Sequence, residues 1–443
     1  MTTSSERRTR PSAHKMQVAT LVCAALFFVP CIHAFNGHRL TLTRFRMSAD
    51  GPRHLDRREA IASAAAAATA GVAASALGGF NTPRVSADAA AAATLAQDAA
   101  SAGSRPLSIP SDQYSTLGSL RVPRIVNGLW QVSGAHGRID PKSAVADMRE
   151  YEDVGLSCWD MADIYGPAER IYAAHLADER ERGADPSRIV GFTKFVPLPQ
   201  DMGRTAVENA IDKSRSRMSV DQLDLLQFHW WVYPDKRYQD AFNNLAALKD
   251  KGKIKNLAVT NFDTQRTREA YESMGIVSNQ VQYSLIDRRP EVALVPFCLE
   301  SGVQLLTYGT LAGGFLTERW LGKKEPSPLQ LDTASLQKYK RMVDTWGGWG
   351  LLQELLVALK DVADKHSVKI PNVAVKYVLD RPAVGGVIVG TRLGVANHVQ
   401  DNLRSFHLRL DDEDRARIDE VLAKSRDMYK AIGDTGDEYR RDW

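Results

Sequence analysis

The stretch "RIVGFTKF", residues 188–195, is a mostly apolar run with Lys194 next to its end. Apolar runs that do not alternate with polar residues are typical of strands buried on both faces of a parallel sheet. A charged side chain in such a strand is costly unless it has a partner. The run "LDLLQFHW", residues 223–230, repeats the pattern and carries His229 next to its end. Together the two runs indicate parallel strands whose ends carry functional polar groups.

Six further runs of this kind lie between residues 124 and 390. They are "RIVNGLW" (124–130), "GLSCWD" (155–160), "IKNLAVTN" (254–261), "SNQVQY" (278–283), "VQLLTYG" (303–309) and "GGVIVG" (385–390). Amphipathic stretches such as 142–155 and 205–218 separate them, as expected for helices. Eight strands alternating with helices predict an α/β fold of the (β/α)8 TIM barrel type over residues 116–430. A doubly wound sheet is the alternative, but no G-x-G-x-x-G follows the first run.

A (β/α)8 barrel places its functional residues at the C-terminal ends of its strands. Polar side chains lie at or near the ends of six of the eight runs. They are Asp160, Lys194, His229, Asn261, Gln280 and Tyr308. One such residue could be ordinary packing, but six together indicate a site at the barrel mouth.

Several segments around these residues resemble the motifs of the aldo-keto reductase superfamily. "WDMADIYGPAE" (159–169) matches its Asp-x-x-x-x-Tyr motif, and "AVTNFD" (258–263) matches its Ser-Asn-Phe segment with Thr260 at the serine position. "YGTLAGGFL" (308–316) and "IVGTRLGVANHVQDNL" (388–403) resemble the segments that hold the cofactor. The resemblance runs from about residue 122 to residue 402 and implies an NADPH-dependent barrel that reduces carbonyl groups without a metal.

The resemblance implies four catalytic residues, Asp160, Tyr165, Lys194 and His229. Tyr165 would donate the proton, although a free tyrosine has a pKa of about 10. A lysine about 4 Å away contributes roughly 4 kcal/mol at an effective dielectric of about 20, so we expect Lys194 to lower that pKa. Asp160 would keep Lys194 charged, and His229 would polarise the carbonyl oxygen. Asp163 has no catalytic counterpart and is expected to be a turn or surface carboxylate.

The resemblance also implies a cofactor site for NADPH or NADP+ and a pocket beside it. Tyr308 would stack on the nicotinamide, with its carboxamide bound by Asn261 and Gln280 near Thr260. Small residues in the segment 309–314 would let backbone N–H groups approach a pyrophosphate. The expected cofactor residues are Thr260, Asn261, Gln280, Tyr308, Gly309, Leu311, Gly390, Thr391, Arg392, His398 and Asn402, and the expected pocket walls are Trp130, Trp230 and Trp231.

The loop after the eighth strand departs from the common family pattern. It is about two residues longer, it begins with Gly390 and Arg392 in place of the more usual Pro-containing start, and His398 stands where many members have Arg or Gln. Arg392 could pair with the 2′-phosphate of NADPH, with the hydroxyl of Thr391 beside it. The residues that follow the seventh strand, 318–350, would either cover the cofactor or decorate the surface.

Composition excludes several other classes of protein. The 443 residues are 44% hydrophobic and 25% charged, as in ordinary globular proteins. Residues 1–58 hold ten Lys and Arg against three Asp and Glu, so a net charge of +4 leaves about −3 for the rest. This body has no basic excess for nucleic acid. Cys158 and Cys298 are too few and too far apart for a disulfide framework or a metal site.

Residues 1–115 resemble a series of targeting signals rather than a folded domain. Residues 1–34 have a basic lead and an apolar core typical of a signal peptide, and no stable membrane span is expected in the mature protein. Phe35 begins a segment rich in Arg, Ser and Thr, like the plastid transit peptides of algae with secondary plastids. Arg57-Arg58 before an Ala-rich run is similar to a thylakoid signal or is a plain linker. The expected location is the plastid, in the stroma or the thylakoid lumen.

The sequence therefore predicts a carbonyl reductase that transfers hydride from NADPH to an aldehyde or ketone. A cofactor-binding regulatory subunit on the same fold is the alternative, and a hydrolase using Asp160 and Asp163 is a distant third. Residues 431–443 are expected to form a C-terminal tail. No pattern in the sequence identifies the substrate or the oligomeric state.

Overall fold

A computed structural model describes residues 107–134, 136–137 and 139–440. The signal peptide expected at 1–34, and the transit segment up to residue 106, lie outside the described residues. Within the described residues, no helix has the length and apolar character needed to cross a membrane.

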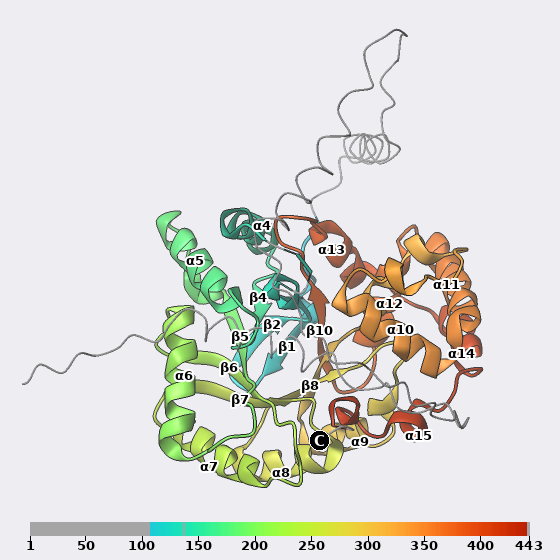
Figure 1. The fold of residues 1–443 in the computed structure, drawn as a ribbon. Coiled ribbons are helices and arrows are strands. Elements are labelled where there is room, and N and C mark those ends of the chain that lie inside the picture. Colours follow the sequence, from blue (N-terminus) through green and yellow to red (C-terminus); the bar gives the residue numbers. More distant parts are fainter. Residues whose placement is uncertain (1–106, 135, 138, 441–443) are drawn as a thin grey trace, which may run out of the picture. The chain divides into compact units, whose positions relative to one another are not determined.

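Eight parallel strands form a closed barrel in the order β10-β3-β4-β5-β6-β7-β8-β9 (Figure 1). The strands are β3 Ile125–Gly128, β4 Cys158–Asp160, β5 Val190–Phe195, β6 Leu223–Phe228, β7 Ile254–Thr260, β8 Ser278–Gln282, β9 Gln304–Tyr308 and β10 Val384–Gly390. Each coincides with one of the eight predicted runs. The predicted (β/α)8 barrel is therefore confirmed, and the doubly wound alternative is wrong because the sheet closes on itself.

Helices follow the strands and cover the outside of the barrel (Figure 1). They are α4 Pro141–Asp153, α5 Ala168–Glu181, α6 Arg204–Met218, α7 Arg237–Asp250, α8 Thr264–Met274, α9 Leu294–Ser301, α12 Ile370–Leu379 and α13 Val399–His407. The start of α4 shows why they begin where they do. The Asp140 carboxylate accepts a hydrogen bond from the backbone N–H of Ser143, and Pro141 occupies the first helical position. The carboxylate satisfies an N–H group that has no partner within the helix, and the fixed backbone angle of proline favours the start of a helix.

Side chains alternate between the inside and the outside of the barrel along each strand. On β6, Leu225 joins the cluster inside the barrel, whereas Leu226 and Phe228 belong to the cluster shared with the helices. Register places Gln227 opposite Lys194 of β5. Because Gln227 follows Leu225 by two residues, it also points into the barrel, one layer below the mouth.

A two-stranded hairpin closes the N-terminal end of the barrel. Its strands are β1 Tyr114–Leu117 and β2 Leu120–Pro123. Leu117 and Leu120 join the cluster inside the barrel, and the Ser115 hydroxyl donates to Gly385 O at 2.6 Å. The hairpin leaves only the opposite end of the barrel open for a ligand.

A second hydrophobic cluster lies beside the barrel and is built from segments that the eight-strand pattern does not include. It gathers α10 Ala334–Trp346, α11 Gly348–Lys365 and α14 Asp412–Leu422 against α12, with α15 Met428–Ile432 at its edge (Figure 1). The segment 318–350, whose place the sequence left open, thus supplies α10 and the start of α11. Through α10 it also borders the barrel mouth.

Candidate active site

A buried network of four side chains forms the floor of the barrel mouth. Lys194 Nζ donates to Asp160 Oδ2 at 2.5 Å and to Met161 O at 2.8 Å. Asp160 Oδ1 accepts from Gln227 Nε2 at 2.8 Å and from Gln280 Nε2 at 2.7 Å. Burial lowers the pKa of Lys194, and the adjacent Asp160 carboxylate opposes that shift. The paired carboxylate therefore favours a charged lysine in a place where an isolated one would lose its proton.

Tyr165 lies beside this network on the loop between β4 and α5. The Lys194 ammonium is 4.9 Å from the centre of its ring. Burial raises the pKa of Tyr165 well above its ordinary value, and the Asp160 carboxylate adds to the rise. The expected lowering by Lys194 is therefore not found in this state, because burial raises the pKa of Tyr165 and the Asp160 carboxylate adds to the rise. Tyr165 is held as a neutral phenol, the protonation state that a proton donor needs.

His229 lies at the end of β6, almost fully buried, with one ring nitrogen turned toward the mouth. Its Nδ1 is 3.0 Å from Thr260 O, and because a carbonyl oxygen only accepts, Nδ1 carries the proton. Burial, with a contribution from Arg440, lowers the pKa of His229 to about 3, so the ring is neutral. Nε2 then bears a lone pair and has no hydrogen-bond partner among the described residues. The expected donor role toward a carbonyl oxygen needs a proton on Nε2; the structure instead provides an acceptor.

Four side chains form a chain of hydrogen bonds that runs in a single direction. Lys338 Nζ donates to the Tyr439 hydroxyl, the hydroxyls of Tyr439 and Tyr308 are 2.8 Å apart, and Tyr308 donates to Asn261 Oδ1 at 2.8 Å. An ammonium can only donate, so the order of donation is Lys338, Tyr439, Tyr308, Asn261. The amide of Asn261 is thereby oriented with its Nδ2 left as the donor.

The two amides that were expected to bind nicotinamide are oriented to complement a carboxamide. Asn261 keeps its N–H groups available because its oxygen accepts from Tyr308. Gln280 donates its N–H groups to Asp160 Oδ1 and to Gln227 Oε1, both at 2.7 Å, which leaves its own Oε1 as an acceptor. One donor and one acceptor match the oxygen and NH2 of a carboxamide, so these residues fit a nicotinamide.

The C-terminal segment packs over the mouth and brings Tyr439 to it. Arg289, whose side chain is 0% exposed, pairs with Asp287 at 2.8 Å and with Glu438 at 3.0 Å. It also donates to Asp434 O at 3.0 Å. Arg440 continues the segment and donates to Trp230 O at 3.1 Å. Tyr439, which lies in the stretch that the sequence set apart as a tail, therefore lines the cleft, and the neighbouring residues anchor it.

The mouth opens into a cleft with a volume of about 820 Å³. It runs past the segment 309–314, where a Cβ added to Gly309 would lie 2.1 Å from the Tyr339 hydroxyl. Gly309 also has a φ of +74°, which a side chain would strain. The sequence-predicted residues that border the cleft are Asp160, Tyr165, Lys194, His229, Thr260, Asn261, Gln280, Tyr308, Gly309, Leu311, Gly390, Arg392, His398, Asn402, Trp130 and Trp231.

Two predicted site residues point elsewhere. The Thr391 hydroxyl donates to Gly128 O at 3.0 Å and is buried against β3, so it does not face a phosphate. Trp230 is fully buried in the core, where its indole N–H donates to Val232 O at 2.8 Å. Both side chains are buried among neighbouring residues, and a motif match does not show on which side of the backbone a side chain lies.

The loop after β10 places Arg392 and His398 at the cleft. Arg392 is exposed and donates to His136 O at 3.2 Å across the cleft mouth. His398 lies 3.9 Å from Asp401 at the start of α13. Arg392 thus remains available to an anion, whereas His398 has a carboxylate beside it.

Asp163 lies in a turn, one of the two alternatives expected for it, and its contacts connect two segments of the candidate site. Its backbone N–H donates to Lys194 O at 3.1 Å, and its carboxylate accepts from Val196 N at 3.2 Å. Burial, with a contribution from Glu169, raises the pKa of Asp163 to about 7. The residue holds the Tyr165 loop against the end of β5.

Four residues of the site were missed by sequence reasoning. Gln227 could have been found from its spacing, since it lies two residues before His229 on the same strand and points the same way. Lys338, Tyr439 and Arg440 belong to segments outside the barrel pattern, and no local signal marked them.

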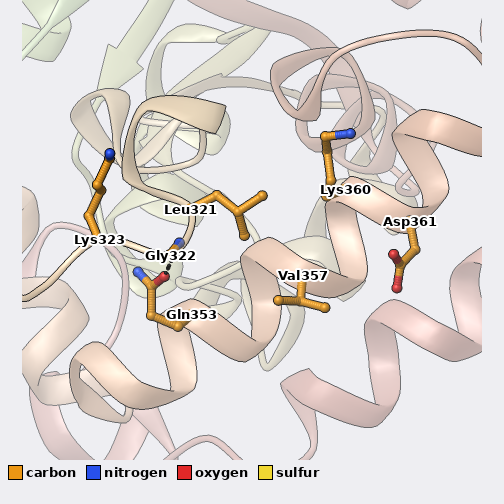
Figure 2. Close-up of a pocket in the computed structure, with 7 residues that line it drawn as sticks. All are labelled: Leu321, Gly322, Lys323, Gln353, Val357, Lys360 and Asp361. Atoms are coloured by element: carbon orange, nitrogen blue, oxygen red, sulfur yellow. Dashed lines mark hydrogen bonds between the residues drawn. The ribbon is translucent and has the colours of Figure 1, made fainter.

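A second hollow of about 580 Å³ lies away from the mouth, between residues 321–323 and α11 (Figure 2). Its lining consists of Leu321, Gly322, Lys323, Gln353, Val357, Lys360 and Asp361. Gly322 N donates to Gln353 Oε1 at 2.8 Å, so the amide is used to hold the loop. The lining holds none of the predicted site residues, and we place the chemistry in the barrel cleft.

Comparison with known proteins agrees with this fold. The profile of the Aldo/keto reductase family matches residues 124–423. The chain is 24% identical over 285 residues to a chloroplastic pyridoxal reductase of Arabidopsis thaliana, covering 61% of this chain and 74% of that protein. It is 26% identical over 314 residues to a probable voltage-gated potassium channel subunit beta of the same plant, covering 66% and 90%. A glycerol dehydrogenase from Gluconobacter oxydans shares the fold with a TM-score of 0.59 and 21% identity, covering 71% of this chain and 96% of that one.

A closed barrel with this mouth, matched by the family over most of its length, defines an oxidoreductase that uses a nicotinamide cofactor. The chain belongs to the aldo/keto reductase family.

Proposed function

We propose that this protein reduces the carbonyl group of an aldehyde or ketone with NADPH. The observation that carries the proposal is the group formed by buried Asp160 and Lys194 and partly buried Tyr165, beside two amides oriented to receive a carboxamide. Bound NADPH supplies the hydride. The residues of this chain have to bind the cofactor, orient the carbonyl and deliver a proton to its oxygen.

Tyr165 is the proposed proton donor, and its neighbours stabilise the negative charge that forms on its oxygen when the proton is transferred. It is neutral at rest, so the proton is present when the carbonyl oxygen becomes negative. Lys194, 4.9 Å from the ring centre, then faces a tyrosinate and stabilises it. Asp160 holds the lysine charged and in place. His229 accepts through Nε2, so it can orient the hydroxyl of Tyr165 or of the product alcohol.

The test is turnover by the purified protein with NADPH and a panel of aldehydes and ketones that includes pyridoxal, the substrate in the name of one relative. We expect NADPH to be oxidised only when a carbonyl substrate is present. Consumption of NADPH no faster than in buffer, with every substrate, would contradict the proposal.

A regulatory subunit that binds the cofactor with little turnover is the second candidate. The similarity to a probable potassium channel subunit beta favours it. The two candidates differ in turnover and not in binding, so the affinity for NADPH should be measured beside the assay. Tight binding without oxidation would support the regulatory role.

We predict a preference for NADPH over NADH that depends on Arg392. The guanidinium is exposed at the cleft, beside the start of α13, where N–H groups favour an anion. A hydrogen bond to a charged group contributes about 1.5–3 kcal/mol, so Arg392→Ala should weaken NADPH binding roughly ten- to a hundredfold. NADH binding should hardly change. Fluorescence titration with both cofactors measures this, and Arg409→Ala, an exposed arginine outside the cleft lining, is the control. Equal losses for both cofactors would show that Arg392 does not read the 2′-phosphate.

We propose that residues 1–115 direct the protein to a plastid, to the stroma or the lumen. The support is their basic and apolar pattern, together with a relative whose name places it in the chloroplast. A fluorescent reporter fused to residues 1–115 should enter the plastid of an alga with complex plastids. Replacing Arg57 and Arg58 with Lys should keep it out of the lumen if they form a twin-arginine signal. A reporter that stays in the cytosol would contradict the targeting.

A further inference from the structure

Gln227 stands out among the side chains inside the barrel because it is an amide at a position where the neighbouring layer is apolar. Leu225, two residues before it on β6, packs with Phe192 and Leu306 in that layer. Gln227 is 0% exposed and lies in register with Lys194 on the neighbouring strand. A buried amide is costly unless it is hydrogen bonded. Its retention beside Lys194 therefore points to a task in the surrounding site.

The hydrogen bonds of Gln227 connect two residues with different tasks. Its Nε2 donates to Asp160 Oδ1 at 2.8 Å, and its Oε1 accepts from Gln280 Nε2 at 2.7 Å. Asp160 belongs to the pair with Lys194 that serves proton transfer. Gln280 faces the cleft and is proposed to bind the carboxamide. Gln227 itself does not border the cleft, so any effect on the reaction is transmitted through these neighbours.

The Asp160 carboxylate fixes the orientation of both amides. Carboxylate oxygens only accept, so each glutamine has to turn its NH2 toward Asp160. Gln227 is then left with its oxygen toward Gln280, where it accepts the second N–H of that residue. If Gln280 rotated by half a turn, its oxygen would meet Asp160 Oδ1 and Gln227 Oε1. Two contacts therefore hold Gln280 with Oε1 available to the cleft.

We propose that Gln227 is a positioning residue that locks the Gln280 amide, so that Gln280 Oε1 accepts the NH2 group of the nicotinamide carboxamide. This inference rests on the proposed cofactor site. The same contacts hold Asp160 in line with Lys194, so one buried amide ties cofactor binding to the proton-donating group. Without Gln227, one N–H of Gln280 is left buried and unpaired, and the amide turns to find another partner.

The test compares the binding of NADP+ with that of its 3-acetylpyridine analogue, which has a methyl group in place of the carboxamide NH2. The wild-type protein should prefer NADP+ by about 3- to 10-fold, the range of one net hydrogen bond. Gln227→Leu, which has a similar shape, should reduce this preference to less than about 2-fold. Both dissociation constants come from fluorescence titration, so the test needs no turnover.

The matched control is Asn279→Leu. Asn279 is a fully buried amide on β8 that faces away from the site and donates to Phe262 O at 2.9 Å and Thr267 Oγ1 at 2.8 Å. This variant should lose stability yet keep the wild-type preference. A purely structural role for Gln227 would lower the affinity for NADP+ and for the analogue equally in both variants.

An unchanged preference in Gln227→Leu would overturn the proposal. If that variant does not fold, Gln227→Met serves instead, because its side chain has a similar length but neither an amide donor for Asp160 nor a strong acceptor for Gln280, so the preference should again be lost. Both dissociation constants can be measured even if the wild-type protein turns over no carbonyl substrate. Failure of the proposed reaction and failure of this inference are therefore distinguishable.

Discussion

Replacing Tyr165 with phenylalanine should lower the rate of carbonyl reduction by at least about 10²-fold, since a positioned proton donor contributes roughly 10²- to 10⁴-fold. The ring would still pack beside Lys194, so the cleft should keep its shape. NADPH affinity should therefore stay near the wild-type value. Steady-state kinetics with the best substrate of the panel, together with a fluorescence titration, measures both quantities. Near-normal turnover in this variant would remove Tyr165 from the role of acid.

The control for this assignment is Lys194→Met, alone and combined with Tyr165→Phe. Lys194 acts on the tyrosinate that forms when Tyr165 gives up its proton, so the two residues act as one unit. Losses from residues that act as a unit do not add. The double variant should be about as slow as the slower single variant. A double variant slower by the product of the two losses would show that lysine and tyrosine act independently.

The barrel could be predicted because its signals are local. The runs at 188–195 and 223–230 show burial in their composition, and a lysine or histidine next to the end of each borders the cleft. The hairpin of β1 and β2 was not predicted, because neither strand forms the continuous apolar run that marks the barrel strands. Its stability comes from contacts with the barrel interior and not from its own pattern.

The charge state of the site could not be predicted from residue types. A lysine near a tyrosine suggests a lowered pKa, but the sequence does not show that burial, with a contribution from Asp160, raises the pKa of Tyr165 instead. A histidine next to a strand end suggests a donor, but the contact of Nδ1 with Thr260 O makes Nε2 an acceptor. In the first case burial decides the charge state, and in the second a contact with a neighbouring strand decides which nitrogen carries the proton.

The contact of Arg289 with Glu438 is the feature of the site that the sequence was least able to predict. It lies on the 3-10 turn after β8 at residues 289–291, while its partner Glu438 is 149 residues further along the chain. No spacing or composition links the two. Their contact nevertheless places Tyr439 next to Tyr308, with the two hydroxyls 2.8 Å apart. The wall of the site that contains Tyr439 therefore depends on a long-range ion pair.

Arg289→Met should destabilise the protein by about 3–5 kcal/mol, the usual cost of leaving a buried charge without its partner. Methionine keeps much of the apolar stem but leaves Asp287, which is 0% exposed, and Glu438, which is 10% exposed, unpaired. Segment 434–440 should detach first, because it loses the bonds to both Glu438 and Asp434 O. Urea unfolding measures the loss, with Arg288→Met, the half-exposed neighbouring arginine, as the control.

The pH dependence of that loss separates an ion pair from simple packing. Burial tends to raise the pKa of Glu438, but the pair with Arg289 outweighs it and leaves the pKa below its ordinary value. A lowered carboxyl pKa contributes stability above the ordinary glutamate pKa of about 4.3 and loses it as the pH falls through the folded-state pKa. The deficit of Arg289→Met should therefore be full at neutral pH and shrink below about pH 4. A deficit that stays constant from neutral to acid pH would mean that Arg289 holds the C-terminal segment by its packing and not by its charge.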